Sequence, residues 1–263
     1  MTPAPATPAA ETPVIELIHV ALRFGEKEVL SDVNLQVNAR ERLVILGQSG
    51  GGKSTILRLV LGILKPTGGN VKFKGLDVGR MGRRRLNKMR QKVGMIYQYS
   101  ALISSLNVRD NLALPLEELT DKTPSEIDDL VMEKLTMVGM ADARDKMPSE
   151  LSGGMRKRVG LARGIMLDPE VILYDEPSAG LDPVISSVID ELIIELSEKI
   201  GATSIIVTHE MESAFKIGTR MAMLFQGRVL AVDTPERFRD HDHPVIAQFI
   251  SGSTEGPILE ASK

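Results

Sequence analysis

Cysteine and tryptophan are both absent from this chain of 263 residues, and aromatic residues make up only 3% of it. Without cysteine the protein has no disulfide scaffold, no thiolate-bound zinc, no cysteine-ligated iron–sulfur cluster and no cysteine nucleophile, although this absence does not identify its compartment. Hydrophobic residues account for 43% of the chain and charged residues for 25%. This composition excludes a disordered or fibrous protein and predicts a globular chain with a substantial core.

Long hydrophobic runs are also lacking. A helix that spans a bilayer needs about 20 consecutive apolar residues, whereas a stretch such as 56–64 is interrupted by Arg58 and Gly62. The chain is therefore not expected to form a channel by itself. Residues 1–13 are rich in Pro, Ala and Thr and have no basic segment followed by an apolar one. We expect them to form a flexible tail rather than a secretory or transit peptide.

An excess of positive charge is missing as well, because 32 Lys and Arg face 35 Asp and Glu, for a net charge of -3. No global field would therefore recruit nucleic acid or acidic lipid. The exception is local, with seven cations in thirteen residues: Arg80, Arg83, Arg84, Arg85, Lys88, Arg90 and Lys92. Leu86, Met89 and Val93 follow helical spacing there, which favours a solvated helix face on the core. Contact with anionic headgroups or with a loop of a membrane protein is the alternative.

Short apolar segments alternate with amphipathic ones along the chain. Segments 43–46, 93–97, 171–174 and 204–207 are apolar throughout and are predicted to be central strands of a parallel sheet, buried on both faces. Strict alternation around Val33 to Val37, and again around Val71 and Phe73, predicts half-exposed strands. Helical periodicity is found in segments 54–64, 127–138, 154–166 and 184–200. This succession predicts an α/β fold.

One region has only helical signals, with Pro115, Pro124 and Pro148 as loop punctuation. We therefore expect four parts in the chain: an N-terminal tail (1–13), a core (14–98 and 168–240), an inserted helical subdomain (99–167) and a C-terminal tail (241–263).

Residues 47–54 match the phosphate-loop pattern of glycine, any four residues, and then Gly-Lys-Ser or Gly-Lys-Thr. An apolar strand enters the loop and an amphipathic helix leaves it, so backbone N–H groups and the positive end of a helix converge on one concavity. Lys53 would reach the β- and γ-phosphates of a nucleotide, and the Ser54 hydroxyl would bind Mg²⁺. The predicted phosphate-binding residues are Gly47, Gln48, Ser49, Gly50, Gly51, Gly52, Lys53, Ser54 and Thr55.

Two acids follow the buried segment 171–174. Asp175 would hold the metal through water, and Glu176 would polarise an attacking water. Alone, this pair could be a solvated strand end. Beside a phosphate loop, it predicts a site for a magnesium nucleotide.

Leu151-Ser152-Gly153-Gly154-Met155 resembles the Leu-Ser-Gly-Gly-Gln signature of the ATP-binding subunits of ABC transporters. The resemblance covers roughly residues 15–230, with several motifs in the family's order. It implies that Phe24 stacks on the nucleotide, that Gln98 is the Q-loop glutamine and that His209 is the switch histidine. Residues 178–182, which end in Asp182, resemble the D-loop. An aromatic residue at position 24 could instead belong to the core, and a lone histidine could simply begin a helix.

The family resemblance implies a Mg²⁺-dependent ATPase with an ABC ATPase fold: a RecA-like P-loop core, an antiparallel β subdomain and the inserted helical subdomain. Its catalytic residues would be Lys53, Gln98, Glu176 and His209, and its metal ligands Ser54, Gln98 and Asp175.

The signature forms a second anion site, because Ser152 is a good N-cap and Gly153 and Gly154 leave the first helical N–H groups unobstructed. In the family this site and Asp182 face the ATP of a partner subunit. One phosphate loop and one signature per chain therefore imply a head-to-tail homodimer with two composite sites. We expect residues 241–263 to add a dimer contact.

Departures from the general family pattern narrow the expected cargo. Met155 replaces the usual glutamine, and segments 99–116 and 249–257 are similar to the ATPases of Mla-type phospholipid transport systems. This similarity implies integral membrane permease subunits, an MCE-type lipid-binding protein and a peripheral location on the cytoplasmic face of the inner membrane. An importer of small solutes such as amino acids is the alternative. A role in DNA repair or at the ribosome would usually need tandem modules, coiled coils or zinc insertions, so no nucleic-acid partner is expected.

Overall fold

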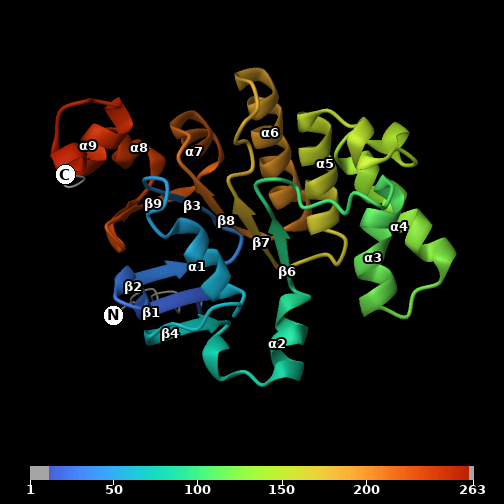
Figure 1. Ribbon diagram of the computed structural model, residues 1–263, viewed down its shortest axis with the longest axis horizontal. Helices are drawn as coiled ribbons and strands as arrows, with labels where there is room; N and C mark the ends of the chain where they lie inside the picture. Colours follow the sequence, from blue (N-terminus) through green and yellow to red (C-terminus); the bar gives the residue numbers. More distant parts are fainter. Residues whose placement is uncertain (1–11, 261–263) are drawn as a thin grey trace, which may run out of the picture.

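The computed structural model describes residues 12–260. Residues 1–11 of the expected N-terminal tail and residues 261–263 lie outside this range. Two sheets with helices around them make up the fold (Figure 1). The larger sheet has the order β10-β9-β3-β8-β7-β6 and is parallel except for the β9–β10 hairpin. Its strands are β3 (Arg42–Leu46), β6 (Val93–Ile96), β7 (Val171–Asp175), β8 (Thr203–Thr208), β9 (Arg220–Phe225) and β10 (Arg228–Asp233).

The strands of the parallel sheet are apolar throughout because the sheet separates two hydrophobic cores. In β3, Val44 and Leu46 join one core, whereas Leu43 and Ile45 join the other. The prediction of buried strands is confirmed for β3, β7 and β8. The predicted central position is wrong for β6, because this strand lies at the edge of the sheet. Segment 93–97 is apolar there because a helix of the inserted region covers it, and Tyr97 lies beyond the strand with 42% of its surface exposed.

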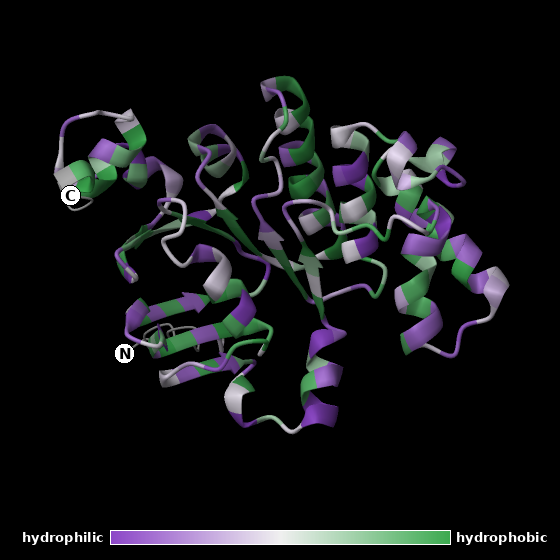
Figure 2. Ribbon diagram, in the orientation of Figure 1, coloured by the Kyte–Doolittle hydropathy of each residue, from purple (hydrophilic) through white to green (hydrophobic). Residues whose placement is uncertain are grey.

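The smaller sheet is antiparallel, with the order β2-β1-β4-β5. Its strands are β1 (Ile15–Phe24), β2 (Lys27–Val37), β4 (Gly68–Phe73) and β5 (Leu76–Asp77). Val33, Leu35 and Val37 are buried and the residues between them are exposed, which confirms the predicted alternation. Figure 2 shows the same contrast between these mixed strands and the uniformly apolar strands of the parallel sheet.

Helix α1 (Lys53–Val60) packs in the core between the smaller sheet and the parallel sheet and is shorter than the predicted 54–64. The chain leaves the helix at Gly62, whose φ is 63°. Arg90 satisfies the last carbonyl groups, since its guanidinium donates to Leu61 O (3.0 Å) and Gly62 O (3.1 Å).

The basic segment forms the 3₁₀ turn η1 (Val78–Arg80) and helix α2 (Arg83–Arg90), the most hydrophilic helix in Figure 2. Met89 is buried and Leu86 is half-buried on its inner face. Val93 does not continue this face, contrary to the prediction, because it is the first residue of β6. Arg90 and Lys92 have protein partners, whereas Arg83, Arg84, Arg85 and Lys88 are exposed.

Between β6 and β7 the chain is helical, with no strand in the described structure: α3 (Val108–Leu119), α4 (Pro124–Met137), η2 (Ala141–Ala143), η3 (Pro148–Glu150) and α5 (Gly153–Gly164). Pro115 does not mark a loop as predicted. It lies inside α3, and the flanking Leu112 and Leu116 are buried, so packing outweighs the missing N–H donor.

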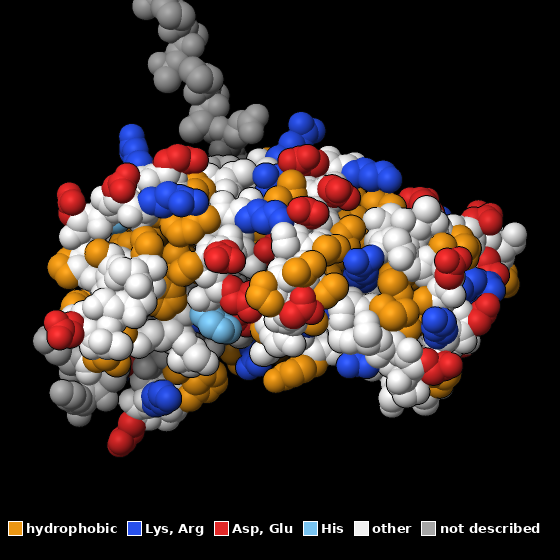
Figure 3. Space-filling model, turned by 90° about the horizontal axis from the view of Figure 1, so that it is seen from above, with side chains coloured by type: hydrophobic (Ala, Val, Ile, Leu, Met, Phe, Trp, Pro, Cys, Tyr) orange, Lys and Arg blue, Asp and Glu red, His pale blue; other side chains and the backbone are white. Residues whose placement is uncertain are grey.

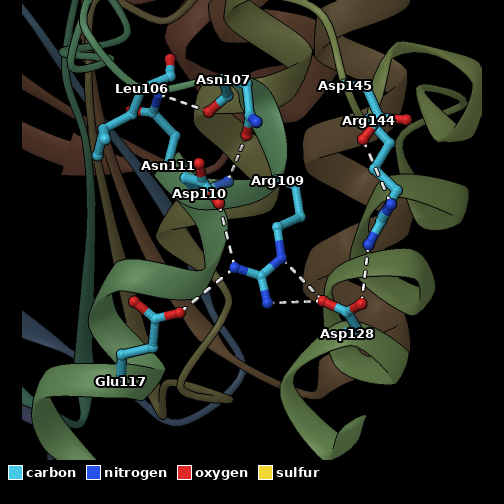
Figure 4. Close-up of polar contacts among 9 residues, drawn as sticks. All are labelled: Leu106, Asn107, Arg109, Asp110, Asn111, Glu117, Asp128, Arg144 and Asp145. Carbon is cyan, nitrogen blue, oxygen red and sulfur yellow. Dashed lines mark hydrogen bonds and ion pairs between the residues drawn. The ribbon is translucent and has the colours of Figure 1, made fainter. Parts of the chain in front are cut away.

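Charged side chains tie these helices together (Figure 4). Arg109 of α3 lies 2.7 Å from Asp128 of α4, and Arg144 lies 2.8 Å from the second oxygen of the same carboxylate. The Arg109 guanidinium lowers the pKa of Asp128, so this bridging carboxylate stays ionised.

The remaining helices are α6 (Pro183–Ile200), α7 (Met211–Ile217), α8 (Pro235–Arg239), α9 (Pro244–Ser251) and α10 (Pro257–Glu260). The last two lie in the expected C-terminal tail, where the Gln248 side chain accepts a hydrogen bond from the Ile258 N–H at 2.8 Å. Among the described residues, no helix has both the length and the apolar character needed to cross a bilayer.

Candidate nucleotide-binding and catalytic site

The site lies at the carboxyl ends of the parallel strands, where ligands of α/β proteins commonly bind. Because β3, β8, β7 and β6 are neighbours, the segments that follow them meet at one edge of the sheet. These segments carry the phosphate loop, His209, the Asp175–Glu176 pair and Gln98, in that order. The topology thus brings together four motifs that are far apart in the sequence.

The phosphate loop requires glycine at two points. Gly47 has a φ of 153°, and a Cβ there would collide with the carbonyl oxygen of Leu224 on β9. Gly52 has a φ of 99° and is the N-cap of α1. A side chain at either position would change the path of the loop around the first helical N–H groups.

Lys53 is buried, with 5% of its surface exposed, and its ammonium group lies inside the loop. Nζ donates to the carbonyl oxygens of Gly47 (2.7 Å) and Gln48 (3.0 Å) and lies 3.7 Å from Glu176 Oε1. Burial lowers the pKa of Lys53, and the charges of Glu176 and Asp175 oppose this shift. These two carboxylates keep a positive charge favourable at the position where phosphate would bind.

Ser54 and Asp175 come together from α1 and β7, because the Ser54 hydroxyl donates to Asp175 Oδ1 at 2.7 Å. A hydroxyl and a carboxylate are the oxygen ligands that Mg²⁺ prefers, and Mg²⁺ usually completes its shell with water and phosphate oxygens. In the part of the chain that the structure describes, no group of three or more His, Asp or Glu could hold a metal. The Ser54 hydroxyl and the Asp175 carboxylate therefore fit a Mg²⁺ ion that also binds the phosphate oxygens of a nucleotide.

Glu176 and His209 form the second close pair. His209 Nδ1 lies 2.9 Å from Glu176 Oε2, and the His209 N–H donates to the same oxygen at 3.4 Å. The Glu176 side chain is 12% exposed. Its backbone has a φ of 49°, in the left-handed region that non-glycine residues rarely adopt. Such backbone strain is common where a side chain is held for function.

Phe24 lies at the end of β1 and is 53% exposed, so the alternative that it belongs to the core is wrong. Gln98 lies two residues beyond β6 and is half-buried. His209 precedes α7, whose first residue is Met211, so it does not begin that helix.

Ser152 is the N-cap of α5, as predicted, and its Oγ accepts a hydrogen bond from the Met155 N–H at 3.3 Å. Asp182 is the N-cap of α6 and accepts from the N–H groups of Val184 and Ile185, both at 3.1 Å. Helices α1 and α5 belong to opposite cores, so the phosphate loop and the signature precede helices on opposite faces of the parallel sheet.

Lys157 of α5 was not predicted as a site residue, yet it is 7% exposed and donates to backbone carbonyls of Gln98 and Glu176. Its signal was present, since position 157 shares a helical face with the small residues Gly160 and Gly164 that pack on β6 and the loop after it. A lysine on this closely packed helix face lies inside the protein, where an ammonium group is rarely found without a functional or structural reason.

A parallel sheet with a phosphate loop at its carboxyl edge, an antiparallel subdomain and an inserted helical region define an ATP-binding cassette. Residues 30–179 match the family model described as ABC transporter, and the chain belongs to this family. It is an ABC-type ATPase, and the predicted fold class is confirmed.

Relatives extend over most of the chain. The chain is 42% identical to the probable ribonucleotide transport ATP-binding protein mkl of Mycobacterium leprae, an alignment that covers 93% of this chain and 70% of the relative. It is 37% identical to the intermembrane phospholipid transport system ATP-binding protein MlaF of Haemophilus influenzae, over 93% of each chain. Among solved structures, the dimeric post-hydrolysis state of the ATP-binding cassette MJ0796 with ADP and Pi has a TM-score of 0.77. That match is 31% identical and covers 84% of this chain and 98% of the other.

Proposed function

We propose that this ATPase energises an ABC transporter that moves phospholipid or a related lipid between membranes. The observation that carries the cargo assignment is the similarity to MlaF over 93% of both chains. The mkl relatives are named for ribonucleotide transport. A small-solute cargo is therefore the outcome against which the lipid proposal is tested.

ATP would stack on Phe24, and its phosphates would bind to the N–H groups of residues 47–55 and to Lys53. In hydrolysis, the protein mainly positions the reactants and stabilises charge, so no covalent nucleophile is needed. Ser54, Asp175 and Gln98 would hold Mg²⁺, which supplies positive charge to the phosphate oxygens when it is bound.

Glu176 would orient and polarise the attacking water, and His209 would contact the γ-phosphate. The short contact between His209 Nδ1 and Glu176 Oε2 supports this pairing, because each side chain limits the rotation of the other. Lys53 Nζ lies 3.7 Å from Glu176 Oε1, so this carboxylate faces a positive charge beside the phosphate position.

A homodimer would complete each site. Ser152, Gly153, Gly154 and Asp182 of one subunit would contact the ATP bound by its partner. Two observations support this arrangement: the phosphate loop and the signature precede helices on opposite faces of the sheet, and the solved cassette with ADP and Pi is dimeric.

A membrane permease would dock on the groove between β6 and helices α3 and α5. This groove has a volume of about 350 Å³ and an apolar lining that includes Met95, Leu114, Leu119 and Leu167. Tyr99, just beyond Gln98, is 86% exposed. A partner seated there would be coupled to the nucleotide through Gln98, and it would hold the ATPase on the cytoplasmic face of the inner membrane. An MCE-type protein would carry the lipid.

Co-purification tests this proposal. The chain would be isolated with its membrane partners in detergent, and bound small molecules would be identified by mass spectrometry. We expect permease subunits, an MCE-type protein and enriched phospholipid. Recovery of a solute-binding protein or of bound ribonucleotide without lipid would overturn the lipid assignment and leave the ATPase intact.

A further inference from the structure

Lys157 makes two contacts that join separate parts of the site. Its ammonium group donates to the carbonyl oxygen of Gln98 at 2.6 Å and to that of Glu176 at 3.3 Å. One acceptor belongs to the Q-loop after β6 and the other to the general base after β7. A single side chain on α5 therefore holds the backbone of both segments.

The burial of this ammonium group is costly and lacks a direct counter-ion. Among the described residues, no carboxylate lies within 4 Å of Lys157 Nζ. Burial lowers the pKa of Lys157, and the more distant charges of Glu210 and Glu176 oppose this shift. A buried cation with carbonyl partners only is rare in proteins. It contrasts with Lys134 of α4, which is equally buried but lies 2.7 Å from Asp168 and 3.0 Å from Glu133.

The rest of α5 holds the Q-loop equally closely. A Cβ on Gly160 would lie 3.0 Å from Ser100 Cβ, and a Cβ on Gly164 would lie 2.8 Å from Ile96 Cδ1. Arg163 donates to the carbonyl oxygens of Ala101 (2.6 Å) and Ser100 (3.3 Å). Lys157 and Arg163 together bind three carbonyl groups of this loop, so the loop is hydrogen-bonded to α5 at three points.

The second acceptor explains why the contact bears on catalysis. Glu176 has a φ of 49°, and this strained backbone is held by its N–H bond to Val207 O (3.0 Å) and by donors to its own carbonyl. Those donors are Lys157 Nζ and the Ala179 N–H, each at 3.3 Å. The direction of the Glu176 carboxylate depends on this backbone conformation.

We propose that Lys157 is a positioning residue that fixes the general base Glu176 relative to the Q-loop and couples both to the signature helix. The inference rests on the proposed function of Glu176 and Gln98. Helix α5 begins at Gly153, about 6 Å along the helix from Lys157. The helix end that would face the partner's ATP is thus joined, through Lys157, to the catalytic groups of its own subunit.

Steady-state ATPase kinetics of the purified full chain test this proposal. Four variants are compared with the wild type: Lys157→Met, Lys157→Arg, Lys134→Met and Glu176→Gln. We expect Lys157→Met to lower kcat at least about tenfold, because displacement of a catalytic group by even 1 Å is costly, while KM for ATP stays within about twofold. Lys157→Arg keeps a cationic donor and should restore most of kcat. Lys134→Met, the matched loss of a buried lysine, should retain kcat within about twofold.

The outcomes distinguish the proposed role of Lys157 from the proposed catalytic role of Glu176. Wild-type turnover in Glu176→Gln would contradict the proposed site itself. Loss of turnover in Glu176→Gln, together with equal kcat in Lys157→Met and Lys134→Met, would overturn the role of Lys157 alone. If Lys157→Met does not fold, Lys157→Gln takes its place, and unchanged kcat in that variant overturns the proposal. A rise in KM with constant kcat would also overturn it, because it would indicate a role in binding ATP.

Discussion

At the scale of single residues, the contact between Glu176 and His209 is the most informative for chemistry. A carboxylate held by Lys53 on one side and His209 on the other cannot turn freely, as its proposed role in activating one water molecule requires.

We expect Glu176→Gln to lose steady-state ATPase activity by on the order of 10²-fold or more, because glutamine keeps the shape but cannot accept the proton from water. Binding of ATP should be retained, as measured by fluorescence with a nucleotide analogue. Glu195→Gln, at an exposed position on α6, is the matched control and should keep wild-type turnover. Unchanged turnover in Glu176→Gln would remove Glu176 from the catalytic role.

Asp190 of α6 supplies a prediction about pH. Its carboxylate is 3% exposed and accepts from the Ser213 hydroxyl at 2.8 Å, while Oδ1 has no hydrogen-bond partner among the described residues. Burial raises the pKa of Asp190 from 3.8 to about 6; Ser213 and Lys216 oppose the shift, and Glu210 and Glu191 add to it. A raised pKa means that this group favours the folded state fully below pH 3.8, and that the advantage is lost as pH rises through about 6.

Asp190→Asn should therefore raise the unfolding temperature at pH 7.5 relative to the wild type, by an amount equivalent to about 1–3 kcal/mol, and should have less effect near pH 4. Thermal unfolding at both pH values measures the difference. Asp121→Asn, on an exposed loop, is the control, and its effect on the unfolding temperature should be the same at both pH values. If Asp190→Asn changed the unfolding temperature equally at pH 4 and pH 7.5, the burial of a charged Asp190 would not be the cause of the stabilisation.

At the scale of elements, the close approach of α5 to β6 determines where the Q-loop lies. Gly94 of β6 permits this approach, because a Cβ there would collide with the carbonyl oxygen of Gly164 and lie 3.2 Å from Pro169 Cγ. The Gly164 backbone on one side and the Pro169 ring on the other leave little room for relaxation. The strand and the helix must therefore separate if position 94 carries a side chain.

Gly94→Ala should destabilise the fold by about 1–3 kcal/mol and lower kcat, since the Q-loop moves with the strand. Urea unfolding and ATPase assays on the same preparation measure both effects. Gly82→Ala is the control, because a Cβ at Gly82 meets nothing within 4 Å and φ there is -68°. Wild-type stability of Gly94→Ala would show that the helix and strand are not in tight contact.

Much of this element structure follows from sequence pattern, and the errors have physical causes. Leu43 to Leu46 predicts a buried strand because apolar runs in parallel sheets reflect cover on both faces. The same pattern cannot tell an edge strand from a central one when a helix covers the edge, as α5 covers β6. Pro115 lies inside a helix, contrary to the prediction, because local propensity does not include the burial of Leu112 and Leu116. The phosphate loop and Asp175–Glu176 were found because their spacing is local, whereas Lys157 acts across three elements.

At the scale of the whole molecule, charge is dispersed. Figure 3 shows acidic, basic and apolar side chains mixed over the upper face of the view in Figure 1. This dispersal agrees with the net charge of -3 and leaves the exposed cations of α2 as the local exception. Specific contacts, rather than a general field, must therefore bring subunits together.

Mixed dimers test whether two chains complete one site. Lys53→Ala removes the phosphate contact, and Ser152→Arg obstructs the signature, so each variant alone should be inactive. In a mixed dimer one site carries both changes and the other carries neither. Statistical exchange of subunits should then recover roughly a quarter of the wild-type rate, since half the dimers each have one intact site. No recovery on mixing, with exchange verified by labelled subunits, would contradict composite sites.

The position of β3 in the sheet also has a consequence for synthesis on the ribosome. This strand leads into the phosphate loop, yet its two neighbours are β8 and β9, so that Arg42 pairs with Ser204 and Leu46 with Met223. Translation reaches these partners only after the inserted helices and α6 have been made. We therefore expect the strand that enters the phosphate loop to be enclosed in the sheet only near the end of translation.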